Sequence, residues 1–161
     1  LDGKAAWAQA GKMPFADLAA LPDGPLLALD PGSKTIGVAV SARSGVVTPV
    51  ETIARTKFTA DAQRVFALYD EFGCVGLVIG LPVNMDGSLG PRAQSARSLG
   101  TNLLRIRDVP VAYEDERLST EEAEERLIAA GMRREQREQV IDAHAAAVIL
   151  ESALRNRAAN S

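Results

Sequence analysis

A continuous apolar run at residues 74–82, CVGLVIGLP, places the tightest constraint on the fold of this chain. The run contains no polar residue, so a strand built from it has no face suited to water. Such strands are covered on both faces, as in parallel sheets that lie between layers of helices. The sequence therefore predicts an α/β arrangement in which helices pack on both sides of a sheet.

The segments around this run alternate between strand-like and helix-like patterns. Three strand-like segments, 26–30, 35–41 and 46–54, come first and indicate an antiparallel meander. A fifth strand is expected at 109–117. Apolar periodicity predicts helices over 58–72, 92–107, 120–130 and 139–156. This order predicts a mixed five-stranded sheet, with three antiparallel strands followed by βα units and with helices on both faces.

The length of 161 residues allows one domain with a real core and leaves too little for two of ordinary size. We expect residues 25–157 to form this domain, residues 1–24 to be an N-terminal extension or a cloning remnant, and residues 158–161 to be a tail. No window reaches the roughly 18 apolar residues of a membrane span. Residues 1–25 also lack the pattern of a signal peptide. We therefore expect a cytoplasmic location and no membrane partner.

The overall charge gives no global attraction for a polyanion, since the formal net charge is −3 and the sequence pI is about 5.2. Local basic patches are still compatible with this balance. Arginines gather in two places, and acids crowd residues 114–125. The arginines are Arg92, Arg97, Arg105 and Arg107, and then Arg133, Arg134 and Arg137.

Acidic residues stand where strands of this sheet end. Asp30 ends the first strand, and Asp115 and Glu116 end the fifth. Ligand sites in open α/β sheets lie at the carboxyl ends of the parallel strands. Asp142 belongs to the last helix, where Ala146 and Ile149 follow on the same apolar stripe. Because close carboxylates repel unless a cation lies between them, this pattern favours a Mg²⁺ or Mn²⁺ site.

Each acid also has a simpler interpretation. Asp30 suits a turn before a Pro-Gly pair, Glu116 suits a surface pair with Arg117, and Asp142 suits a helix cap or a first-turn acid. Alternate residues of a strand share a face, so Glu116 and Asp115 point to opposite sides of the sheet. The two are therefore not interchangeable as ligands, and the choice of Glu116 rests also on the family resemblance given next.

Four ordered motifs resemble one family. LDPGSKTIGVAVS, GLPVNMDGSLGPRAQSARSLGTNL, YEDERLSTEEAEERL and IDAHAAAVILE are similar to the YqgF, or RuvX, family, to which Holliday-junction resolution and pre-16S ribosomal RNA cleavage are ascribed. The likeness covers about residues 26–155. It implies a ribonuclease-H-like fold related to the RuvC resolvases, and it implies that Asp30, Glu116 and Asp142 are catalytic, metal-binding residues. RuvC-type relatives use a fourth acid in the last helix, whereas this chain has Ala145 and Ala146 one turn beyond Asp142.

These observations predict a metal-dependent nuclease that hydrolyses phosphodiester bonds in branched DNA, in a ribosomal RNA precursor, or in both. The glycine-rich loop NMDGSLGPR, residues 84–92, and the residues near it supply candidate groups for binding phosphate. Arg92 and Arg97 are equally well explained as ordinary surface residues of a helix. Paired nicks in a junction need two active sites and hence a homodimer, whereas trimming an RNA end needs one. The candidate substrate-binding residues are Gly32, Lys34, Asn84, Arg92, Arg97 and Arg117.

Two other functions are compatible with the sequence. The first is a non-catalytic module that binds nucleic acid or assembling ribosomes. The three acids expected at one end of the sheet argue against it, because they favour a catalytic activity. The second is a domain related to the actin-like ATPases, which hold ATP between two lobes. One chain of this length lacks the second lobe, so the ATPase is the weaker alternative.

Overall fold

The structure is a computed structural model that describes residues 18–116 and 119–159. The elements fall where the sequence predicts them, and most boundaries agree within two residues. In chain order they are η1 (Leu18–Ala20), β1 (Leu26–Pro31), β2 (Thr35–Ser41), β3 (Val47–Ala54), α2 (Phe58–Glu71), β4 (Gly76–Leu81), α3 (Pro91–Ile106), β5 (Val111–Asp115), α4 (Ser119–Ala129) and α5 (Arg134–Ala159).

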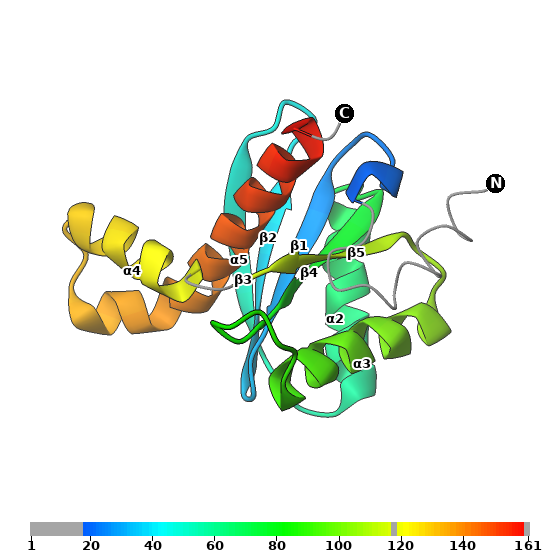
Figure 1. The fold of residues 1–161 in the computed structure, drawn as a ribbon, viewed down its shortest axis with the longest axis horizontal. Coiled ribbons are helices and arrows are strands. Elements are labelled where there is room, and N and C mark those ends of the chain that lie inside the picture. Colours follow the sequence, from blue (N-terminus) through cyan, green and yellow to red (C-terminus); the bar gives the residue numbers. More distant parts are fainter. Residues whose placement is uncertain (1–17, 117–118, 160–161) are drawn as a thin grey trace.

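The five strands form one mixed sheet in the order β3-β2-β1-β4-β5. β1, β2 and β3 pair antiparallel, and β1, β4 and β5 run parallel to one another. Helices lie on both faces, with α5 on one side and α2 and α3 on the other (Figure 1). The predicted fold class is therefore confirmed, and the apolar run that suggested it forms β4, in which every residue is buried.

Alternate residues of each strand supply two separate cores. On one face, Leu27, Leu29, Leu77 and Ile79 pack with side chains of α2 and α3. On the other face, small residues such as Ala28 pack with α5. Short side chains on this second face, Ala39 and Ala112 among them, let α5 lie close to the sheet. Asp30 continues the alternation that begins with Ala28, so it points to the α5 side.

Gly37 of β2 marks the closest approach of helix and sheet. A methyl group added at Gly37 would collide with the carbonyl oxygen of Asp142 in α5. The helix presents alanines to the sheet here, and Ala143, Ala146 and Ala147 are all buried. Glycine at this position thus lets the backbone of α5 rest on β2, and the strand register places Gly37 opposite Asp30.

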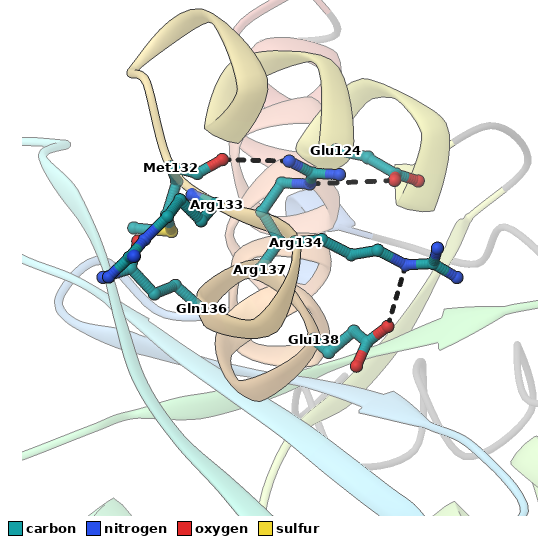
Figure 2. Close-up of polar contacts among 7 residues, drawn as sticks. All are labelled: Glu124, Met132, Arg133, Arg134, Gln136, Arg137 and Glu138. Carbon is teal, nitrogen blue, oxygen red and sulfur yellow. Dashed lines mark hydrogen bonds and ion pairs between the residues drawn. The ribbon is translucent and has the colours of Figure 1, made fainter.

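The last helix begins earlier than the sequence predicts, at Arg134 instead of residue 139. Its first turn is polar throughout and carries no apolar stripe, so periodicity misses it. Side chains hold the turn instead (Figure 2): Gln136 accepts a hydrogen bond from the backbone N–H of Arg133, and Arg137 donates to the carbonyl of Met132. The first of these is half of a capping box, in which the third helical residue reaches back to the cap.

The arginines at this turn bond within the hairpin formed by α4 and α5. Arg134 pairs with Glu138 one turn on, and Arg137 lies 3.9 Å from Glu124 of α4 (Figure 2). The hairpin extends away from the body of the sheet (Figure 1). The basic cluster predicted at 133–137 is therefore partly neutralised by its own acids.

Residues just before β1 pack against the domain. Leu21 is buried in the α5-side core, and Arg157 of α5 donates to its carbonyl oxygen and pairs with Asp23. This contact ties the start of the sheet to the end of α5. Within the described ranges, no helix is both long enough and apolar enough to cross a membrane.

We predict that Gly37→Ala destabilises the fold by about 1–3 kcal/mol, the usual penalty for overpacking a core, because the methyl group must push α5 away from β2. Urea denaturation measures the change. Gly90→Ala is a matched control, since its methyl group would meet mainly the exposed side-chain amide of Asn84. Equal stability losses in the two variants would show that the α5 contact imposes no special constraint.

Candidate active site

Two carboxylates from different strands face each other at the α5 side of the sheet. Asp30 lies in β1, and Glu116 follows β5 with its backbone N–H donating to the carbonyl of Leu81 at 3.1 Å. β4 separates the two strands, and Gly80 leaves room above it. A methyl group there would lie 2.8 Å from Glu116 Oε2. A glycine in β4, the strand between β1 and β5, is thus what lets the Glu116 side chain fold over the sheet.

Burial, followed by the close contact between the two carboxyls, dominates the electrostatics of this pair. Burial, followed by the neighbouring Asp30 carboxyl, raises the pKa of Glu116 to about 9. Burial also raises the pKa of Asp30, with Asp142 adding to the effect and Glu116 opposing it. Two close carboxyls in a poorly solvated site cannot both ionise without help, so one of them keeps a proton.

One oxygen of the pair has no partner. Glu116 Oε2 is fully buried and accepts no hydrogen bond. A buried unsatisfied acceptor is unfavourable, and the usual partners of a buried carboxylate oxygen are a hydrogen-bond donor or a metal ion. Hard oxygen donors of this kind suit Mg²⁺ or Mn²⁺. The chemistry of Asp30 and Glu116 therefore fits a divalent cation.

Asp142 reaches the same site from α5. It lies about two turns inside the helix, so the interpretation of Asp142 as a cap or first-turn acid is wrong. Its Oδ2 accepts a hydrogen bond from Thr35 Oγ1 at 2.6 Å, which draws the carboxylate toward β2. No group of three or more His, Cys, Asp or Glu side chains within residues 18–116 and 119–159 is placed so that it could hold a metal ion together.

A cleft of about 300 Å³ joins the three acids, and we call it the carboxylate cleft. Arg92, from the first turn of α3, stands at its edge with a guanidinium nitrogen 4.0 Å from Glu116 Oε1. Its side chain is 73% exposed, whereas that of Glu116 is 8% exposed. The cleft is lined by Asp30, Gly32, Pro82, Val83, Met85, Arg92, Glu116, Thr120, Glu121 and Asp142.

Of the predicted substrate-binding residues, the structure places some in the carboxylate cleft and others away from it. Gly32 and Arg92 line the cleft, and Lys34 lies exposed in the turn beside it. Asn84 donates to Ser88 Oγ within its own loop, and neither Asn84 nor Arg97 is among the residues that line the cleft. Arg117 lies outside the described residues.

Neighbouring acids of β5 divide between the two faces as the strand pattern predicts. Glu116 lines the cleft and Asp115 does not. Glu114 points to α5 but is used for packing: its carboxylate accepts hydrogen bonds from Ser152 Oγ at 2.9 Å and Asn156 Nδ2 at 2.6 Å. Sequence patterns did not single out Glu114, because its partners lie 38 and 42 positions away, at i and i+4 of α5.

The family comparison agrees with the motifs. Residues 24–156 match the model of a family described as RuvX, Holliday junction resolvase. A protein of Paramagnetospirillum magneticum described as "Putative pre-16S rRNA nuclease" is 54% identical over 136 residues, which cover 84% of this chain and 88% of that protein. One of Rhodospirillum rubrum with the same description is 53% identical over 143 residues, covering 87% and 88%.

A solved structure has the same fold. RuvC of T. thermophilus, in complex with a Holliday junction substrate, superposes with a TM-score of 0.56 and covers 86% of this chain and 98% of that one. The sequences are 17% identical, so this similarity bears on the fold alone.

We predict that, in chelator, Glu116→Gln melts no lower than wild type, and that its advantage grows from about pH 5 to about pH 9. The unfolded state releases the Glu116 proton above the ordinary pKa of 4.5, whereas the folded state keeps it up to about 9. Wild type therefore loses stability over this interval, and the glutamine variant lacks this loss.

Calorimetric melting curves at the two pH values test this prediction. We expect a relative gain of at least roughly 2–4 °C at the higher pH, the shift that about 1 kcal/mol produces in a chain of this size. The full pKa difference sets an upper limit of several kcal/mol. Glu125→Gln, at an exposed site of α4, is the matched control. A pH-independent difference for Glu116→Gln would contradict the burial of a strained carboxyl pair.

Proposed function

Since the chain belongs to the RuvX family, we propose that it is a divalent-metal-dependent nuclease that cleaves pre-16S ribosomal RNA near its 5′ end. The observation that carries the proposal is the buried Asp30–Glu116 pair with an unpartnered carboxylate oxygen. A cation resolves the repulsion of this pair, and a cleft beside a metal centre is a setting for phosphodiester hydrolysis. The curated relatives described as pre-16S rRNA nucleases support the choice of RNA.

Asp30 and Glu116 would hold Mg²⁺ or Mn²⁺, with Asp142 as the third ligand. When bound there, the cation supplies Lewis-acid stabilisation of the phosphodiester and a more acidic attacking water. A carboxylate has two acceptor oxygens, so the Thr35 hydrogen bond to Oδ2 is compatible with metal binding through Asp142. Thr35 thus positions Asp142 and keeps its carboxylate within reach of the cleft.

Arg92 is suited to the phosphate and not to a structural role. It is mostly exposed, it stands at the edge of the cleft, and its guanidinium is 4.0 Å from the Glu116 carboxylate. A guanidinium can donate two parallel hydrogen bonds to a phosphate. Arg92 would therefore orient the scissile group against the carboxylates and neutralise part of its charge.

Junction resolution is the second candidate, and the family description favours it. The described residues, 18–116 and 119–159, form one carboxylate cleft that holds Asp30 and Glu116, so symmetric nicking of a four-way junction would require two chains. Product analysis on junction DNA, single-stranded RNA and a 5′-extended 16S precursor separates the candidates, with Mg²⁺ and Mn²⁺ compared. RNA-selective cleavage supports the proposal. Binding without cleavage of any substrate would favour the non-catalytic module.

We predict that Asp30→Asn lowers the cleavage rate by more than about two orders of magnitude while the fold stays intact. Metal-centred charge stabilisation is worth several kcal/mol, and each 1.36 kcal/mol is about tenfold in rate. Asp115→Asn, on the neighbouring acid that does not line the cleft, should keep most of the activity. Circular dichroism checks the fold. If Asp115→Asn were inactive and Glu116→Gln active, Asp115 and not Glu116 would be the catalytic residue.

We predict that Mn²⁺ raises the melting temperature of wild type more than that of Asp142→Asn, because binding to the folded state alone stabilises it and the variant lacks one ligand. Scans in chelator and in excess Mn²⁺ measure both shifts. Glu125→Gln should respond like wild type. Matching shifts for Asp142→Asn would remove Asp142 from the metal site.

A further inference from the structure

A second, wider groove of about 960 Å³ adjoins the carboxylate cleft, and we call it the basic groove. Gly32, Arg92 and Asp142 line both depressions, so the two are continuous. The rest of its wall comes from the turn between β1 and β2, from residues 55–56 after β3, and from Ser95 of α3. A chain that leaves the cleft past Arg92 therefore enters this groove.

Charge changes sign from one depression to the other. The carboxylate cleft is lined by Asp30, Glu116, Glu121 and Asp142, with Arg92 as its one base among the described residues. In the basic groove, bases outnumber acids among the described residues. They include Lys34, Arg55 and Arg92 and one acid, Asp142, whose carboxylate already accepts a hydrogen bond from Thr35. The first surface suits a cation, and the second suits an anion.

Arg55 is fixed in place before any ligand arrives. One guanidinium nitrogen donates to the Gly32 carbonyl at 2.6 Å, and the Arg55 backbone N–H donates to the Lys34 carbonyl at 2.9 Å. The side-chain bond uses one of the five N–H donors of a guanidinium. The charge is thus held against the turn with little left to lose in rotamer entropy, which favours binding.

The turn itself is also held. The Gly32 N–H donates to the Thr35 carbonyl at 2.8 Å, and both ends of the turn are bonded to Arg55 through Gly32 and Lys34. Lys34 is exposed at the tip. A fixed guanidinium beside a flexible ammonium, with Ser33 and Ser95 also lining the groove, is an arrangement that recognises phosphate oxygens.

We propose that the basic groove binds the phosphodiester backbone of the substrate strand next to the cleavage point, with Arg55 and Lys34 contacting a flanking phosphate. This inference rests on the proposed function, because the strand is the one whose scissile phosphate lies in the carboxylate cleft. Arg55 is not a catalytic residue, since it holds the strand at a site beside the reacting atoms. A polynucleotide fits better than a free anion because the groove continues from the cleft.

Binding without cleavage tests the proposal. A short fluorescein-labelled single-stranded oligoribonucleotide is titrated with the full chain in chelator, and anisotropy gives the affinity at several salt concentrations. Lys34→Gln and Arg55→Gln should each weaken binding about tenfold. Each should also reduce the slope of log affinity against log salt by about 0.7, the contribution of one phosphate contact on a single strand. Arg55→Lys should keep the wild-type slope because it keeps the charge.

Arg43→Gln is the matched control, because it removes the same charge at a different depression of the surface, one lined also by Val40 and Phe72. It should bind like wild type. Lys34 is exposed, so its variant reports on binding even if Arg55→Gln loses stability. Wild-type affinity and salt slope in Lys34→Gln and in folded Arg55→Gln would overturn the proposal, and so would a wild-type chain that binds no RNA at low salt.

The same set separates this inference from the proposed function. A wild-type chain that cleaves RNA but binds it independently of Lys34 and Arg55 would overturn the groove alone. An Asp30→Asn variant that still cleaves, with binding dependent on Lys34 and Arg55, would overturn the metal site alone.

Discussion

The close contact between α5 and β2 is the constraint on which the candidate site depends. Gly37 has no side chain, and the backbone of α5 at Asp142 occupies the space where one would be. Buried alanines on the helix continue the contact along the sheet. Because Gly37 is paired with Asp30, this contact brings a helix residue and a strand residue 112 positions apart (142 − 30) to one edge of the sheet. The packing of small residues is therefore also what gathers the acids.

The acids carry an energetic penalty that the fold must bear. Glu116 is nearly buried beside Asp30, and one of its oxygens has no partner. Dispersion and apolar burial on both faces of the sheet offset this cost, with β4 wholly covered. Natural proteins keep such exceptions to the rule that buried charges are paired chiefly at functional sites. The buried carboxylate pair breaks this rule in the same way, which is why the proposed function assigns a divalent cation to it.

Sequence patterns predicted the sheet well because each strand carries its own signal. β4 is apolar throughout, and the meander shows β-branched residues around short turns. The two-residue alternation of β5 was also sufficient to separate Glu116 from Asp115. The start of α5 was missed because its first turn is held by side-chain bonds of Gln136 and Arg137 and not by an apolar stripe. That error is what made a capping role for Asp142 conceivable.

The residues missed at the site share one cause. Arg55 and Thr35 reach it only through the register of three neighbouring strands, and nothing in their local sequence marks them. Conversely, Asn84 stands in a conspicuous glycine-rich loop but bonds within that loop. Local sequence thus singled out the acids because their charge is conspicuous, whereas the bonds from Thr35 to Asp142 and from Arg55 to Gly32 follow from long-range pairing.

The position of β5 at the edge of the sheet has a consequence for how the molecule responds to heat. β5 pairs with β4 on one side only, and its contacts with α5 include the hydrogen bonds that Ser152 and Asn156 donate to Glu114. Edge segments with few such ties open by local fluctuation well below the free energy of global unfolding, and their amide protons exchange early. Glu116 follows the last residue of this strand. The geometry of the carboxylate pair therefore depends on the pairing of β5 with β4, its one neighbour in the sheet, and local opening of this edge would separate the two acids.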